Sequence, residues 1–400
     1  MLVLFLVVVI DLIGFGIIIP LLPFFAEYYQ ASPFEVGLLM ASYSLAQFIA
    51  APIWGRMSDR IGRRPVLLVS LAGAMLTYVW LGLADSLWVL FAARIAGGFM
   101  AGNISAAFAY VADITTRENR AKGMGVVGAA FGLGFILGPA IGGIMAGSDP
   151  LHADFQSPAF TAAGLSAAAL ILGIFTLKES LSDEILARIA AKPKVSRLRQ
   201  FRTALEIPNI RLLLALSFLA IFAFAGIEAT FALWSRRQFG WGPEQNGYLF
   251  ALIGLLNAAM QGGLIGRMAK RFGETSLLLQ GSIALTIGIA MIPFASNLWV
   301  LIPAMMIATY GFSIISPALN SLISLQTGEE EQGGMMGVTR SATTLARVAG
   351  PAWAGLLFST FGMNWPYFGG ACVMAVVVGL VIWRFPALKK VDGKNLQKSA

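Results

Sequence analysis

Apolar residues run along the chain in long blocks that are separated by short polar and charged turns. Each block is about 20 residues long, which is the length of an α-helix that crosses the hydrocarbon core of a bilayer. Breaking the sequence at its turn and charge patterns predicts twelve membrane-spanning helices. Their ranges are 2–27, 35–55, 66–84, 87–112, 123–147, 158–177, 210–235, 244–266, 275–295, 298–325, 333–358 and 364–384.

The composition excludes an ordinary soluble enzyme. Hydrophobic residues make up 58% of the 400 residues and charged residues only 12%, whereas about 25% is usual in a globular domain. The lone cysteine, Cys372, cannot form a disulfide within the chain, and the lone histidine, His152, gives no metal-ligand cluster. The sequence has no nucleotide-binding GxxxxGK[ST] motif and no nucleophile paired with a base. We therefore expect an all-α membrane protein that is not an enzyme and needs no cofactor.

The net charge of +8 could indicate a nucleic-acid partner, but the placement of the basic residues favours membrane topology. If both termini are cytoplasmic, 23 of the 28 Lys and Arg residues fall in inner loops and the tail, and only Arg236 and Arg237 fall in outer loops. The positive-inside rule predicts this orientation. We expect a multi-pass protein of the cytoplasmic (inner) membrane that binds no nucleic acid.

Two pairs of similar segments indicate that the chain is duplicated. GRMSDRIGR begins at residue 55 and GRMAKRFGE at residue 266, an offset of 211 residues, while GPAIGG at 138 and GPAWAG at 350 differ by 212. Two six-helix halves of this kind place a substrate cavity at their interface near mid-membrane. The predicted parts are an N-terminal half (1–177), a cytoplasmic linker (178–209), a C-terminal half (210–385) and a cytoplasmic tail (386–400).

A few charged residues fall inside the predicted spans, where each costs about 2.5 to 3.5 kcal/mol. Asp11 lies about 15 Å into the first helix at 1.5 Å per residue, near the bilayer midplane. Partial desolvation favours the neutral form of such a carboxyl group, so Asp11 could load and release a proton. Glu228 is the second candidate, although it could instead reach the outer interface or pair with a neighbour. Arg347 is too deep to reach water and needs a buried partner.

Four motifs give the sequence a family resemblance. They are DLIGFGIIIPLLP from residue 11, GRMSDRIGRRP from 55, RIAGG from 94 and GLGFILGPAIGG from 132. In this order they resemble the major facilitator superfamily, and within it the twelve-helix drug/proton antiporters of the tetracycline-efflux and multidrug type. The resemblance implies the major facilitator fold and outward transport. It also implies a role for Arg94 in proton coupling, and Arg94 could approach the depth of Asp11 and pair with it.

The resemblance implies a conformational latch at the inner ends of the helices. Asp59 would cap the N-terminus of the eleventh helix, and Arg63 would pair with Asp113; alternatively, the arginines of this loop only set topology. In the fifth helix, close-packed glycines and a bending proline predict tight packing against another helix, with a dimer face as the alternative. The predicted gating residues are Gly55, Asp59, Arg60, Gly62, Arg63, Arg64, Asp113, Gly134, Gly138, Pro139, Gly142 and Arg347.

Substrate-binding candidates are three amide side chains inside the spans. Asn257 and Gln261 lie one turn apart on the eighth helix, and Gln47 lies on the second. The tetracycline pumps that this chain resembles have a histidine at the position of Asn257 and an acidic residue at that of Thr77. A different or broader substrate range is therefore expected.

The charged residues inside the spans, together with the outward direction that the family resemblance implies, predict a proton-coupled exporter of drug-like, amphipathic small molecules that works by alternating access. A proton-coupled importer or uniporter of a small metabolite is the alternative, but the scarcity of buried polar groups argues against sugars. The expected partners are the lipid bilayer, a small-molecule substrate and protons. The proton gradient would supply the energy, and the chain would act as a monomer.

Overall fold

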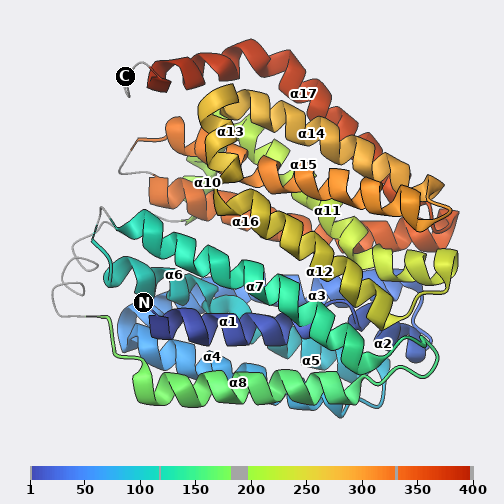
Figure 1. Ribbon diagram of the computed structural model, residues 1–400. Helices are drawn as coiled ribbons and strands as arrows, with labels where there is room; N and C mark the ends of the chain where they lie inside the picture. Colours follow the sequence, from blue (N-terminus) through green and yellow to red (C-terminus); the bar gives the residue numbers. More distant parts are fainter. Residues whose placement is uncertain (1, 117–118, 182–196, 329–331, 397–400) are drawn as a thin grey trace. The chain divides into compact units, whose positions relative to one another are not determined.

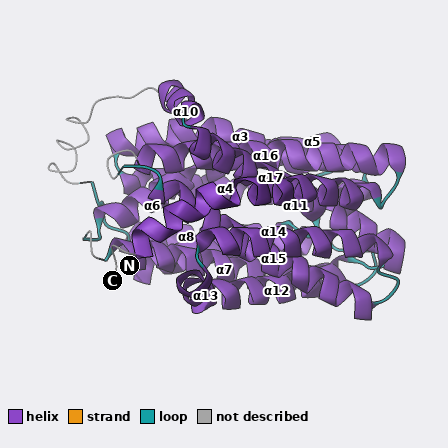
Figure 2. Cartoon of the chain, turned by 90° about the horizontal axis from the view of Figure 1, so that it is seen from above, coloured by secondary structure: helices purple, strands orange, loops and turns teal. Residues whose placement is uncertain are grey.

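The computed structural model describes residues 2–116, 119–181, 197–328 and 332–396. Within these ranges the chain consists of helices joined by loops and contains no strand (Figure 2). The predicted all-helical architecture is confirmed. Residues 182–196 of the predicted linker and the last four residues of the predicted tail lie outside the described residues.

The chain forms two compact units. The first contains Met1–Pro193 and Ala232–Leu255, and the second contains Lys194–Phe231 and Leu256–Ala400. The chain therefore passes from one unit to the other three times. Helices α11 and α12 each contribute residues to both units, whereas the division predicted from the repeat lies within the linker; the two homologous halves remain a prediction.

The helices that lie wholly in the first unit follow the predicted spans closely. They are α1 (Leu2–Ile18), α2 (Leu22–Tyr28), α3 (Pro33–Ile61), α4 (Arg63–Gly82), α5 (Leu87–Met100), the 3-10 helix η1 (Ala101–Asn103), α6 (Ile104–Asp113), α7 (Arg120–Ala146) and α8 (Gln156–Thr176). Helix α1 packs against both α7 and α8 (Figure 1). Two of the predicted spans are not single α-helices. The span 2–27 is interrupted between α1 and α2, and the span 87–112 is interrupted by η1.

Local sequence explains where these helices begin. At the start of α3, Ser32 and Glu35 form a capping box in which the Glu35 amide donates to Ser32 Oγ (3.3 Å) and the Ser32 amide donates to Glu35 Oε2 (2.7 Å). At the start of α8, Asp154 Oδ1 accepts hydrogen bonds from the backbone amides of Gln156 and Ser157. These oxygens satisfy amide groups that have no partner inside the helix.

The remaining helices begin in the second unit or are shared with the first. They are α10 (Arg197–Glu206), α11 (Pro208–Phe239), α12 (Pro243–Ala259), the π-helical segment η2 (Met260–Leu264), α13 (Ile265–Phe272), α14 (Glu274–Met291), the 3-10 helix η3 (Ile292–Phe294), α15 (Leu298–Leu325), α16 (Gln332–Phe361) and α17 (Trp365–Leu396). Helix α10 was not predicted, and α17 runs beyond the predicted span.

Eleven helical segments in the described part of the chain are long and apolar enough to cross a membrane. The one predicted span that is not among them is the eleventh (333–358), which corresponds to α16; this helix has 30 residues and so exceeds the length needed. Arg340 and Arg347 lie within α16. Charged residues within a spanning helix are costly, so these two arginines mark α16 as a candidate functional helix.

Candidate functional site

Asp11 lies in α1 where that helix packs against α7 and α8. One turn later, Gly14 allows close approach to α8, because a Cβ at this position would lie 3.3 Å from the carbonyl oxygen of Ala162. Ser166 on α8 lies within electrostatic reach of the Asp11 carboxyl group. Asp11 forms no ion pair with any residue that the structure describes. It is thus a carboxyl group in an apolar helix without a cation to hold it ionised.

Arg94 on α5 is buried, with 7% of its surface exposed. The predicted pair with Asp11 is absent; instead the guanidinium carbon of Arg94 lies 4.1 Å from the centre of the Tyr43 ring, which α3 contributes. This geometry is a cation–π contact. Both Asp11 and Arg94 interact electrostatically with Tyr43 and with Tyr78 on α4. Asp11 and the Arg94 cation therefore belong to the same unit, with Arg94 packed on Tyr43.

Aromatic rings continue this cluster. The rings of Phe15 and Tyr43 lie 5.4 Å apart, and those of Phe15 and Phe135 lie 6.2 Å apart in an edge-to-face arrangement. Gln47 is one turn from Tyr43 on α3, and its Nε2 donates to the carbonyl oxygen of Ala101 (3.2 Å). The predicted substrate-binding residue Gln47 and two of the predicted coupling residues, Asp11 and Arg94, thus lie in the first unit, beside aromatic side chains that sequence reasoning had not singled out.

Glu228 and Arg347 form an ion pair in the second unit. Arg347 Nη1 on α16 lies 3.2 Å from Glu228 Oε2 on α11. The Glu228 side chain is 17% exposed and that of Arg347 is 42% exposed. This contact supplies the partner that Arg347 was expected to need, and it matches the alternative in which Glu228 pairs with a neighbour.

The polar group on α12 includes one residue that the sequence analysis missed. Gln261 Nε2 lies 2.9 Å from Asn257 Oδ1, as expected for amides one turn apart. Ser313 on α15 also reaches Asn257, with its Oγ 2.8 Å from the same Oδ1. Gln261 belongs to the π-helical segment η2, in which Gly263 has a φ of 134°. Such segments often occur at functional sites, and only glycine adopts this conformation readily.

The junction between α3 and α4 forms a charged network. Arg63 is buried, and its Nε donates to Asp113 Oδ2 on α6 (3.0 Å), which confirms the predicted contact. Its Nη1 lies 2.5 Å from Asp59 Oδ1 and 2.8 Å from Ser58 Oγ. Asp59, near the end of α3, thus pairs with Arg63, the first residue of α4, in this structure. The latch function itself remains a prediction.

Glu179 is a member of this network that sequence reasoning missed. Its carboxylate accepts hydrogen bonds from the backbone amides of Arg63 (2.8 Å) and Arg64 (3.1 Å), the first two residues of α4. Gly62 precedes them with a φ of 107°, and a Cβ there would collide with the Glu179 carboxylate. A carboxylate at a helix N-terminus is stabilised by the helix dipole. The start of the linker therefore fixes the start of α4.

The other predicted residues of this loop have separate surroundings. Arg64 Nη2 donates to the carbonyl oxygen of Ile174 (2.7 Å). Arg60 is exposed, in keeping with a topological role. Gly55 has one near neighbour, since a Cβ there would lie 3.8 Å from Ser105 Oγ. Helix α3 could therefore accommodate a small side chain at this position.

The glycine face of α7 packs on α1. A Cβ at Gly134 would lie 2.6 Å from Cβ of Leu12, and one at Gly138 would lie 2.5 Å from Cα of Gly16. A Cβ at Gly142 would collide with the backbone of Ile17. Pro139 lies inside the helix next to Gly138. This contact supports the internal packing role rather than the dimer alternative.

An ion pair joins α2 and the end of α11 in the first unit, and sequence reasoning did not foresee it. Arg236 Nη1, near the end of α11, lies 2.6 Å from Glu27 Oε2 on α2. The two side chains are 27% and 14% exposed, respectively. Arg236 had been assigned only to an outer loop, and residues so far apart in sequence gave no pattern that could have paired them.

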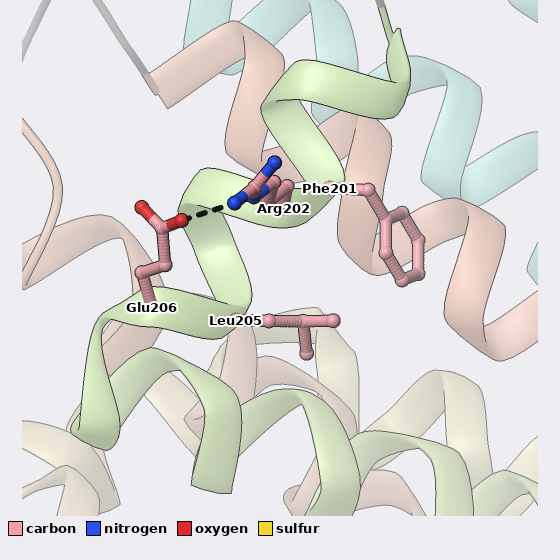
Figure 3. Close-up of a pocket in the computed structure, with 4 residues that line it drawn as sticks. All are labelled: Phe201, Arg202, Leu205 and Glu206. Carbon is pink, nitrogen blue, oxygen red and sulfur yellow. Dashed lines mark ion pairs between the residues drawn. The ribbon is translucent and has the colours of Figure 1, made fainter.

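A hollow on the linker helix α10 is separate from these groups. It is lined by Phe201, Arg202, Leu205 and Glu206 (Figure 3). Arg202 Nε lies 3.3 Å from Glu206 Oε1, and both side chains are exposed. None of the predicted site residues lines this hollow.

Comparison with known proteins gives consistent matches over nearly the whole chain. A sequence profile of the Major Facilitator Superfamily matches residues 4–351 and 262–400. The chain is 32% identical to the class C tetracycline resistance protein of Escherichia coli over 386 residues, which cover 96% of the chain and 94% of that relative. It is 30% identical to multidrug resistance protein 2 of Bacillus subtilis over 379 residues, covering 93% and 92%. The crystal structure of the human organic anion transporter MFSD10 superposes with a TM-score of 0.71 and 26% identity, covering 95% of this chain and 98% of that one.

Proposed function

The chain belongs to the major facilitator superfamily of membrane transporters, and from this we propose that it exports amphipathic, drug-like small molecules in exchange for protons. Relatives named for tetracycline and multidrug resistance support this direction and this class of cargo. Alternating access in two six-helix halves would move the cargo. The proton gradient would supply the energy without any cofactor.

One observation carries the proposal of proton coupling. Asp11 is a carboxyl group within α1, in a stretch of apolar residues, and it has no ion-pair partner among the described residues. An ionisable residue at membrane depth is costly and marks a proton or substrate path by default. Glu228, in contrast, is held by Arg347. We therefore assign proton binding to Asp11 first, with Arg94 as the nearby positive group and Glu228 in a secondary role.

The remaining parts of the proposal follow from the charge distribution. Basic residues concentrated in the loops assigned to the inside support a protein of the cytoplasmic membrane with both termini in the cytoplasm. We propose that the chain functions as a monomer, because the glycine face of α7 is occupied by α1. The candidate cargo-binding amides are Gln47 in the first unit and Asn257 and Gln261 in the second.

Everted membrane vesicles test the proposal directly. A drug panel in a pump-deficient host first identifies a compound to which the protein confers resistance. Adding this compound to vesicles acidified inside by respiration is expected to release protons, and Asp11→Asn is expected to abolish the release at unchanged expression. Asp149→Asn, which alters an exposed acid in an outer loop, is the matched control and should behave like wild type. Drug movement without any proton release, or full coupling in Asp11→Asn, contradicts the proposal.

A further inference from the structure

Arg94 is a buried cation without an anionic partner. Its side chain makes no hydrogen bond and no ion pair with any residue that the structure describes, and its Nε is fully enclosed without an acceptor. Burying an arginine side chain in a membrane-spanning helix is costly, and such residues usually pair with an acid or with backbone carbonyls. Among the described residues, Arg94 has neither an acid nor a backbone carbonyl as its partner.

The Tyr43 ring compensates the guanidinium only in part. A cation–π contact stabilises the face of the planar group, but it leaves the N–H donors at the edge without acceptors. Among the described residues no side chain or carbonyl pairs with the two Nη groups either, and unlike Nε they are not fully enclosed, so an added acceptor can reach them. Their fork geometry matches the two oxygens of a carboxylate.

The surroundings of Arg94 explain why this chain lacks the partner. Thr77 of α4 is buried and lies next to the turn of α5 that contains Arg94 and Gly97, since a Cβ at Gly97 would lie 3.5 Å from Thr77 Oγ1. The hydroxyl of Thr77 is already used, because it donates to the carbonyl oxygen of Ala74 (2.8 Å). The position beside Arg94 that could hold a negatively charged side chain is therefore occupied by the neutral Thr77.

We propose that Arg94 and Tyr43 form a subsite for a carboxylate group of the cargo, attached to a flat ring system that packs against the aromatic cluster of Phe15 and Phe135. This assignment rests on the proposed function as an exporter and narrows its cargo. The cargo carboxylate accepts hydrogen bonds from the Nη groups and supplies the missing negative charge. The ring system packs against the Phe15 ring, whose centre lies 5.4 Å from that of Tyr43 and 6.2 Å from that of Phe135.

Exchange against protons adds a second requirement to the cargo. A carboxylate at Arg94 does not compete with a proton at Asp11, whereas a cationic amine does. Asp11 lies one turn before Phe15 on α1, the Phe15 ring lies 5.4 Å from that of Tyr43, and Arg94 packs on the same Tyr43 ring, so one molecule can approach both. The subsite therefore favours zwitterionic aromatic compounds, with the carboxylate at Arg94 and the amine displaced from Asp11 by the incoming proton.

Binding to the purified protein in detergent tests the subsite without a proton gradient. The probes are the zwitterionic fluoroquinolone ciprofloxacin and its methyl ester, which share the ring system and the amine and differ in the carboxylate. Wild type is expected to bind the acid at least about tenfold more tightly than the ester, because hydrogen bonds between charged groups are lost with the ester. Arg94→Gln is expected to remove this preference, and Arg94→Lys to keep part of it.

A second variant tests the same idea with Arg94 retained. Thr77→Asp places a carboxylate side chain beside Arg94. This carboxylate should neutralise the Arg94 charge and lower the affinity for ciprofloxacin to that for its methyl ester or below. Arg202→Gln, an exposed arginine on α10, is the matched control and should keep the wild-type preference (Figure 3). Equal affinities of wild type for acid and ester, no measurable binding of the acid, or an unchanged preference in both Arg94→Gln and Thr77→Asp overturns the subsite. Proton release from vesicles is measured separately, so a failure of coupling is distinguished from a failure of this subsite.

Discussion

Replacing Gly138 by alanine should destabilise the protein because α7 touches the backbone of α1 at this residue. The added Cβ would lie 2.5 Å from Cα of Gly16 and 2.8 Å from the carbonyl oxygen of Ile13. Both are main-chain atoms, which cannot rotate away as a flexible side chain could. Overpacking of this kind costs about 1 to 3 kcal/mol, while alanine gains up to about 1 kcal/mol in helix propensity over glycine.

A matched control on the same helix separates these two contributions. Gly128 also lies within α7, and a Cβ there would have no neighbour within 4 Å outside its own helix. Gly128→Ala therefore gains the helix propensity without the collision. Subtracting the two variants leaves the packing cost, so Gly138→Ala should be less stable than Gly128→Ala by about 1 to 3 kcal/mol.

Thermal unfolding of the purified variants in detergent, followed by tryptophan fluorescence, measures the difference. Gly138→Ala is expected to unfold below wild type, and Gly128→Ala at or above it. Drug resistance in a pump-deficient host should fall in the same order if close contact of α1 and α7 is needed for transport. Equal unfolding temperatures for the two variants would show that α1 and α7 do not approach as closely as described.

Three further predictions concern charged groups. Arg347→Gln and Glu228→Gln should each destabilise the protein, and the double variant should lose less than the sum, since the pair's oxygen and nitrogen are 3.2 Å apart; additive losses in unfolding measurements would refute the pair. Asp113→Asn should slow transport while largely keeping drug affinity, because it weakens the hold on Arg63; an unchanged turnover rate in vesicles would remove the latch role. Glu179→Ala should destabilise the protein more than Glu179→Gln, because the amide oxygen still accepts from the α4 backbone; the reverse order of unfolding temperatures would contradict the capping role.

The sequence predicted the helices well because apolar blocks of membrane length are its dominant pattern. The observed α15 (Leu298–Leu325) coincides with its predicted span. Helix α10 was missed because its residues mix charged and apolar types and were assigned to a linker on charge alone. The end of α17 was missed because the helix continues past the apolar block into Lys389 and beyond.

The sequence could identify residues of the candidate site only where a charged side chain falls inside an apolar span. Asp11 and Arg94 stood out as charges inside apolar spans, and the structure places both in the first unit, with Arg94 packed on Tyr43. Tyr43 did not stand out, because an aromatic residue in a spanning helix is unremarkable without knowledge of its neighbours. Glu228 and Arg347 were each singled out, but they lie 119 residues apart in sequence, and spacing of that size carries no information about contact.

The three passages of the chain between the two units bear on how the protein could be divided. Residues Ala232–Leu255 follow the linker in sequence, yet they complete the first unit. A polypeptide cut within 182–196 would yield an amino-terminal fragment that lacks part of its own unit and a carboxy-terminal fragment that carries the missing piece. The amino-terminal product would therefore need its carboxy-terminal counterpart to be made in the same cell, because only that counterpart supplies Ala232–Leu255.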